Sequence, residues 1–112
     1  MMGKHLIVDI HNISNSVLLT TVEGVEPLMR KIIEVGNLHV VGELKHQFKP
    51  KGATILYLLS ESHLSIHTYP ETNYSTIDLY CCNPLVNMGD ILDCIYQYFN
   101  GDCFIMKKII DR

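Results

Sequence analysis

The feature that most constrains this chain is a change in the spacing of its apolar residues, from alternate positions to every third or fourth position and back again. Alternating apolar and polar side chains are typical of strands with one buried face, whereas spacings of three and four mark one face of a helix. Strand-like runs cover residues 4–11, 38–48, 53–59, 62–69, 74–82 and 103–110. Helical spacing occurs after the first run and again after the fifth.

Each of the two helical stretches has a single apolar face. The first face consists of Val25, Leu28, Met29, Ile32 and Ile33, and the second of Met88, Ile91, Leu92, Ile95 and Phe99. Pro27 predicts that the first helix begins near residues 24–26, because proline is tolerated only in the first turn. The order β-α-β-β-β-β-α-β predicts an α+β fold, a two-layer α/β sandwich in which two helices cover one face of a mostly antiparallel sheet.

Length and composition exclude several classes of protein. We expect the 112 residues to form one domain with a modest core. The net charge of −3 and the lack of a basic run argue against a nucleic-acid partner. Every apolar run is broken well before the ~18 residues that a membrane span needs. The first residues, Met1 to His5, lack a signal-peptide pattern, so we expect a cytoplasmic protein with reduced cysteines at positions 81, 82, 94 and 103.

The stretch from Leu59 to Cys82 gathers serine, histidine, acidic, tyrosine and cysteine side chains: LSESHLSIHTYPETNYSTIDLYCC. Taken one at a time, these side chains have ordinary structural explanations. A histidine on a strand usually lies at the surface, and a cysteine at a strand end usually behaves as a small buried apolar residue.

Taken together, the stretch resembles a known family. ESHLSIHTYPE, residues 61–71, is similar to the E-S-H-hydrophobic-x-I-H-T-W-P-E pattern of the prokaryotic-type S-adenosylmethionine decarboxylases, which are pyruvoyl enzymes. A strand that ends in cysteine follows it here, as in the family, in residues 77–82. GKHL at residues 3–6 and Phe48-x-Pro50-x-Gly52 extend the resemblance over nearly the entire chain.

The resemblance implies that the chain is a proenzyme that cleaves itself between Glu61 and Ser62. The Ser62 hydroxyl would attack the Glu61 carbonyl and convert the amide to an ester. β-Elimination and loss of ammonia would then leave residues 1–61 and a chain of residues 62–112 that begins with a pyruvoyl group. The family assigns to His67 the removal of the Ser62 α-proton. Thr54 stands where the family often has a serine that supports processing.

The resemblance also implies the reaction of the mature enzyme. The pyruvoyl carbonyl would form a Schiff base with the α-amine of S-adenosylmethionine and act as the electron sink for decarboxylation, a step in spermidine and polyamine biosynthesis. Cys82 matches the family's proton donor, and a thiol with a reference pKa near ~8.5 suits this role. Cys81 is adjacent, but strand alternation places the two thiols on opposite faces.

For substrate binding, the family pattern points to three residues. Phe48 matches an aromatic that stacks on adenine near the sulfonium. Tyr69 replaces the usual tryptophan, and Glu71 matches the glutamate that binds the ribose hydroxyls. No metal ligand is implied. Because an ideal strand would point Ser62 and His67 to opposite faces, we expect a bend near residues 61 and 62.

Three alternatives stay open at this point. The chain could be a related pyruvoyl decarboxylase of arginine or ornithine, an inactive paralogue that regulates a partner, or a zinc module that uses His63, His67, Cys81 and Cys82. An inactive paralogue would typically have lost Ser62, His67 or Cys82, and all three are present. The His-x3-His spacing on a strand is poor for tetrahedral zinc.

Finally, we expect a homodimer of processed protomers. Family members of this size resemble half of the longer eukaryotic-type enzymes, and they form active sites at the interface between two protomers. A domain with an apolar second sheet face would also gain core by burying that face against an identical copy.

Overall fold

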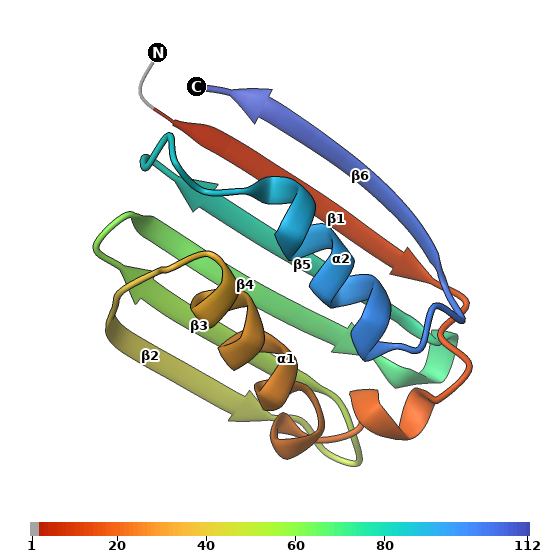
Figure 1. The fold of residues 1–112 in the computed structure, drawn as a ribbon. Coiled ribbons are helices and arrows are strands. Elements are labelled where there is room, and N and C mark those ends of the chain that lie inside the picture. Colours follow the sequence, from red (N-terminus) through yellow and green to blue (C-terminus); the bar gives the residue numbers. More distant parts are fainter. Residues whose placement is uncertain (1–2) are drawn as a thin grey trace.

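The computed structural model describes residues 3–112 and contains one six-stranded sheet (Figure 1). The strand order is β2-β3-β4-β5-β1-β6, and every neighbouring pair is antiparallel. The strands are β1 (Lys4–His11), β2 (Val40–Gln47), β3 (Ala53–Leu59), β4 (Ser62–Tyr69), β5 (Tyr74–Cys81) and β6 (Phe104–Asp111). Met1 and Met2, the first residues of the segment that lacks a signal-peptide pattern, lie outside the described residues.

Two α-helices, α1 (Val22–Val35) and α2 (Met88–Tyr98), cover the same face of the sheet (Figure 1). Short 3₁₀ helices, η1 (Ser16–Leu19) and η2 (Pro70–Thr72), lie in the connections that follow β1 and β4. The α+β class, the two layers and the predicted order of elements are therefore confirmed. None of the described helices is long and apolar enough to cross a membrane.

The core lies between the helices and the sheet. Alternate side chains of the four central strands are buried there, including Leu6, Val8, Ile10, Ile55, Leu64, Ile66, Ile77 and Leu79. The remaining side chains of these strands lie on the opposite face, which we call the open face because no helix in residues 3–112 packs on it. Five of the six histidines of the chain occupy strand positions of the open face: His5, His11, His46, His63 and His67.

The start of α1 differs from the prediction. The helix begins at Val22, two residues before the predicted window, and Pro27 lies inside it. Thr21 sets this start, because its side-chain oxygen accepts a hydrogen bond from the Gly24 N–H at 3.0 Å. An N-cap of this kind satisfies one of the unpaired donors of the first turn, which favours an earlier start than the proline alone would suggest.

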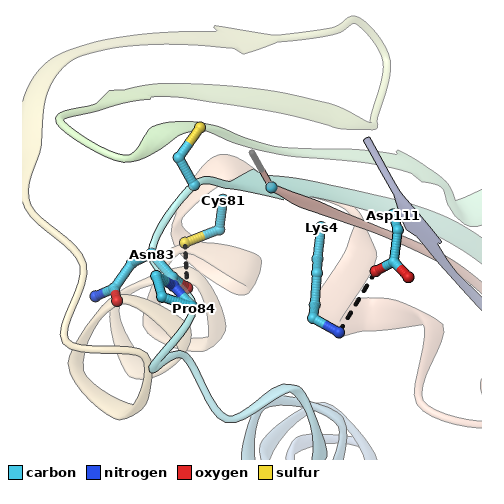
Figure 2. Close-up of a pocket in the computed structure, with 7 residues that line it drawn as sticks. Lys4, Cys81, Asn83, Pro84 and Asp111 are labelled. Atoms are coloured by element: carbon cyan, nitrogen blue, oxygen red, sulfur yellow. Dashed lines mark hydrogen bonds and ion pairs between the residues drawn. The ribbon is translucent and has the colours of Figure 1, made fainter. Parts of the chain in front are cut away.

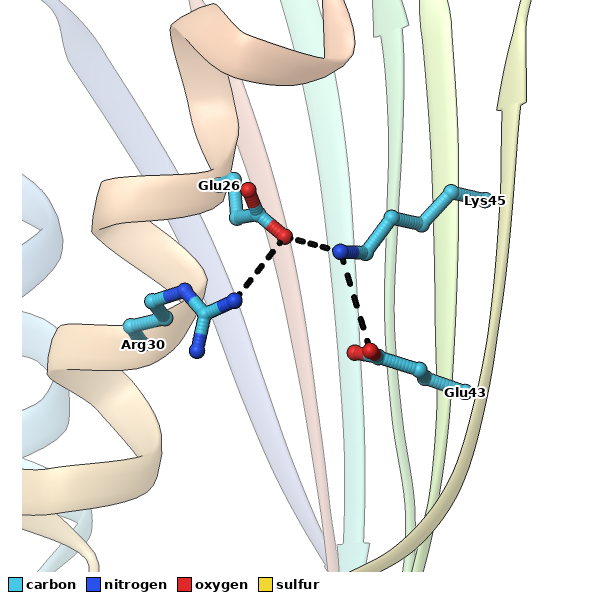
Figure 3. A network of polar contacts seen from close by, with 4 residues as sticks. All are labelled: Glu26, Arg30, Glu43 and Lys45. Carbon is cyan, nitrogen blue, oxygen red and sulfur yellow. Dashed lines mark hydrogen bonds and ion pairs between the residues drawn. The ribbon is translucent and has the colours of Figure 1, made fainter.

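The edge strand β2 is tied to α1 by charged side chains (Figure 3). Glu26 on α1 pairs with Arg30 at 3.3 Å and with Lys45 on β2, and Lys45 also lies 3.7 Å from Glu43. The hydrogen bond from Lys45 lowers the pKa of Glu26. Near its start, β2 contains a bulge, since the register with β3 shifts between Val40 and Gly42.

Candidate active site

The predicted cleavage point lies at the turn of a tight hairpin. A two-residue loop, Ser60 and Glu61, joins β3 to β4, and Ser62 pairs with Leu59 on one side and Cys81 on the other. Ser62 has a φ angle of 147°. Within residues 3–112, the other non-glycine residues with positive φ are all asparagines, with values from 51° to 57°. This φ is rare for serine, which indicates a strained backbone at the cleavage point. The backbone also departs here from an ideal strand, at the position where a bend was expected.

Glu61 is held by both its side chain and its carbonyl. The His39 backbone N–H donates to Oε1 at 3.0 Å, and Nδ1 of His39 donates to Oε2 at 2.6 Å. This bond from His39 lowers the pKa of Glu61. The main-chain oxygen of Glu61 accepts from the Cys82 N–H at 3.0 Å. A donor on a carbonyl stabilises negative charge that develops there during nucleophilic attack.

The two adjacent cysteines lie in different environments. Cys81 is buried, and this burial raises the pKa of its thiol. Its Sγ lies 3.8 Å from the main-chain oxygen of Asn83. Cys82 is exposed, which agrees with the predicted alternation. Both help to line a cavity of about 220 Å³, together with Gly3, Lys4, Asn83, Pro84 and Asp111. Figure 2 shows Lys4 and Asp111 paired at one side of this cavity.

A second group of predicted residues lies elsewhere on the sheet. Thr54 Oγ1 and His67 Nδ1 are hydrogen-bonded at 2.8 Å across β3 and β4. They line a cavity of about 320 Å³ together with the substrate-binding candidates Phe48, Tyr69 and Glu71. We call this group the His67 cluster. Its cavity is within the size range of small-molecule sites, and it offers aromatic faces beside a carboxylate.

The turn between β2 and β3 fixes the place of Phe48 in this cluster. The Phe48 N–H donates to the Gly52 oxygen at 2.8 Å, and the Gly52 N–H donates to the Thr20 oxygen at 2.8 Å. The Gln47 side chain adds bonds to the Thr20 and Gly52 oxygens at 2.9 and 3.1 Å. Gly52 has a φ of 116°, which L side chains rarely adopt. The glycine of the Phe-x-Pro-x-Gly motif is therefore needed for the turn that presents Phe48.

Within one chain, the two groups do not meet. Ser62 and Cys82 lie at one end of the paired strands β4 and β5, whereas His67 lies five positions further along β4. Five residues of extended strand span about 16 Å. One protomer therefore brings Phe48, Thr54, His67, Tyr69 and Glu71 together, and Ser62 with Cys82, but leaves these groups well apart.

A polar group that the sequence did not predict lies on the open face near Cys82. His5 Nε2 lies 3.0 Å from Asp78 Oδ1. The rings of His5, His63 and Tyr80 also cluster, with every pair of ring centroids within 6.4 Å. Alternation along β1, β4 and β5 was the signal that would have placed these side chains on one face.

The zinc alternative loses its geometric basis. Cys81 is buried on the helix-covered side, away from the face that carries His63 and His67. Within residues 3–112, no three histidine, cysteine or acidic side chains are close enough together to hold a metal ion.

Comparisons with known proteins identify the family that this chain resembles. Residues 4–111 match the family model described as S-adenosylmethionine decarboxylase. The chain is 39% identical over 108 residues to S-adenosylmethionine decarboxylase proenzyme 2 of Bacillus cereus. This alignment covers 96% of this chain and 87% of that protein. It is 41% identical over 108 residues to the S-adenosylmethionine decarboxylase proenzyme of Thermoplasma acidophilum, with 96% and 82% covered. The crystal structure of the adenosylmethionine decarboxylase from Aquifex aeolicus superposes with a TM-score of 0.88 at 31% identity, covering 99% and 90% of the two chains.

Proposed function

The chain belongs to the S-adenosylmethionine decarboxylase family, and we propose that it is a proenzyme that cuts itself between Glu61 and Ser62. Its mature form decarboxylates S-adenosylmethionine and so supplies aminopropyl groups for spermidine and other polyamines. The main support for the proposed cleavage is the strained φ of 147° at Ser62, which follows a Glu61 carbonyl bound by a backbone N–H. The cytoplasmic location stays a prediction.

In the proposed cleavage, the Ser62 hydroxyl attacks the Glu61 carbonyl carbon. The Cys82 N–H, 3.0 Å from the carbonyl oxygen, stabilises the negative charge that forms there. The C–N bond breaks and leaves an ester between Glu61 and the Ser62 side chain. His67 then removes the Ser62 α-proton, and elimination releases residues 1–61 with a free carboxylate at Glu61. Water replaces the nitrogen of the resulting dehydroalanine, ammonia leaves, and residue 62 becomes pyruvoyl.

Thr54 supports the base in this scheme. When Nδ1–H of His67 donates to Thr54 Oγ1, at 2.8 Å, the Nε2 atom keeps its lone pair and is free to accept a proton. The hydroxyl thus holds the orientation of the ring and can accept from Nδ1–H in this tautomer. Serine at this position, as in much of the family, would do the same.

The residues around Ser62 fit a pyruvoyl group. Residue 62 pairs with Cys81, the neighbour of the exposed Cys82, and both cysteines help to line the cavity of about 220 Å³. A pyruvoyl group supplies an electrophilic carbonyl that binds the substrate amine and accepts electrons as CO2 leaves. Cys82 then donates the proton that replaces the lost carboxylate on the substrate carbon. Phe48 and Tyr69 would bind the adenine, and Glu71 the ribose hydroxyls, in the 320 Å³ cavity of the His67 cluster.

We propose further that each complete site is shared between two protomers. The separation of about 16 Å between Ser62 and His67 along β4 is too large for proton transfer within one chain. If two open faces pack about a two-fold axis, the hairpin end of one protomer lies over the His67 cluster of its partner. His67 of the partner subunit would then reach Ser62. Because such a contact is isologous, it creates two equivalent sites.

One assay tests the substrate. Release of CO2 should be measured from S-adenosylmethionine, arginine and ornithine with a single preparation of the cleaved protein. We expect turnover with S-adenosylmethionine alone, since Phe48, Tyr69 and Glu71 provide contacts for a nucleoside that a plain amino acid lacks. Release from arginine or ornithine at a comparable rate would contradict the proposed substrate.

A further inference from the structure

The connection between α1 and β2 makes three hydrogen bonds to the two-residue loop that precedes the cleavage point. Its residue His39 donates from its backbone N–H and from Nδ1 to the two carboxylate oxygens of Glu61 at 3.0 and 2.6 Å. The His39 carbonyl accepts from the Ser60 N–H at 2.8 Å. We call this set of contacts the His39 clamp. It leaves only 12% of the Glu61 side chain exposed, although loops of this kind normally lie free in water.

The clamp depends on an irregularity in the edge strand. Val40 pairs with Leu59 and Gly42 with Leu58, so Val41 is an extra residue on β2. A bulge bends its strand and changes the direction in which neighbouring groups point. Here it lies between the regular part of β2 and His39, next to the loop that His39 contacts. Bulges are frequently found beside active sites for this reason.

The clamp acts on the atoms that must react. The Glu61 side chain is fixed by His39, and the Glu61 carbonyl is fixed by the Cys82 N–H at 3.0 Å. Ser62 follows directly with its unfavourable φ of 147°. Such a backbone conformation persists only where the surrounding contacts over-determine it. Without the clamp, this segment would be held only by the Cys82 bond and the strand pairing of Ser62, and it could relax toward an ordinary hairpin.

We infer that His39 is a positioning residue for self-cleavage: through Glu61 it holds the Glu61–Ser62 peptide in the geometry from which the Ser62 hydroxyl attacks. This inference rests on the proposed self-cleavage. His39 touches none of the reacting atoms, so its effect is on the rate of cleavage and not on the decarboxylation that follows. After cleavage the same contacts would keep Glu61, then a chain terminus, in place.

The test is a time course of cleavage during cell-free synthesis of the full chain, with intact chain and fragments separated by mass. In His39→Ala the Nδ1 donor is lost, whereas in His39→Asn the side-chain amide nitrogen occupies a similar position. Losing one hydrogen bond to a carboxylate should slow cleavage about tenfold or more in His39→Ala. His39→Asn should restore most of the rate. Lys31→Ala, which removes an exposed ion pair on α1, is the matched control and should cleave as the unaltered chain does.

Two further measurements separate positioning from damage to the fold. In an uncleavable Ser62→Ala background, His39→Ala should lower the melting temperature by only a few degrees, because one hydrogen bond to a carboxylate is lost while the core is unchanged. Once cleavage is complete, CO2 release per cleaved chain should match that of the unaltered protein. Cleavage of His39→Ala at the unaltered rate, or equal slowing in His39→Asn, would overturn the inference. Failure of the unaltered chain to cleave would instead overturn the proposed self-cleavage itself.

Discussion

At the scale of single residues, Cys81 and Cys82 show how strand geometry gives two identical side chains different properties. Cys81 belongs to the buried face of β5, where burial raises the pKa of its thiol and favours the uncharged form. Cys82 follows the end of the strand and is exposed, beside the hairpin that carries Ser62. Alternation alone separated the two in the sequence. The roles proposed for the two thiols rest on this difference in access.

Replacing Cys82 with alanine should leave self-cleavage intact but slow decarboxylation strongly, because the thiol acts only after CO2 has left. Products of misplaced protonation should accumulate, and mass spectrometry of the substrate pool would detect them. Cys81→Ala is the paired control, since it removes the neighbouring thiol, which is buried and has a raised pKa. Severe loss of turnover in Cys81→Ala with a benign Cys82→Ala would show that the assignment of the two thiols is reversed.

Glu61 gives a prediction for pH dependence. The hydrogen bond from His39 lowers the pKa of Glu61 below its usual value of 4.5. The ionised side chain therefore stabilises the folded precursor fully above about pH 4.5, and this contribution is lost as the pH falls through the lowered pKa. In the Ser62→Ala background, the free energy of unfolding should fall less steeply with acid in Glu61→Gln than in the parent. Equal acid dependence of the two proteins, measured by denaturant titration, would contradict this.

At the scale of elements, apolar periodicity predicted every strand and both α-helices in the correct order. Pattern alone predicted β4 correctly, because residues 62–69 alternate without interruption. The apolar pattern did not predict two features, the start of α1 and the bulge in β2. The start of α1 was placed too late, since a proline was given more weight than the capping Thr21. The bulge at Val41 has no distinctive residue, so its consequence, the contact between His39 and Glu61, was visible only in three dimensions.

The cap of α1 can be tested by Thr21→Ala in the uncleavable Ser62→Ala protein. Loss of the bond from the Gly24 N–H should reduce the free energy of unfolding by about 1 kcal/mol. Thr72→Ala is a suitable control, since the exposed hydroxyl of Thr72 makes only a weak bond of 3.3 Å to the Tyr69 oxygen. Denaturation midpoints of the three proteins decide the matter. Equal stability of Thr21→Ala and the parent would mean that the cap does not set the start of the helix.

At the scale of the whole molecule, both the open face and the division of the site residues into two groups support the proposed dimer. The predicted site residues lie in two groups on one sheet. The family pattern in the sequence names these residues but does not say how far apart they lie in the fold. Large apolar side chains are exposed in β2, β3 and β6, including Leu44, Leu56, Leu58, Phe104 and Met106. Packing this face against a second copy would bury apolar side chains and join the hairpin end to the His67 cluster.

Complementation tests the shared site. Cys82→Ala and Glu71→Gln chains, each of which should have little activity alone, should be co-expressed with different tags. In a mixed dimer, one site would carry both changes and the other would carry neither. With random pairing, half of the dimers are mixed and one of their two sites is intact, so about one quarter of the unaltered activity should return. Absence of any recovery in isolated mixed dimers, or full activity of a monomer in sedimentation, would contradict a shared site.

The central claim, that this chain makes its own catalytic group at Ser62, is tested most directly by the intact mass of the purified protein. We predict two fragments, residues 1–61 ending in an ordinary carboxylate and residues 62–112 beginning with a pyruvoyl group instead of serine. The Ser62→Ala protein should give a single uncut chain with no decarboxylase activity. Cleavage at the same bond in Ser62→Ala, or an uncut unaltered protein that decarboxylates S-adenosylmethionine, would contradict the account.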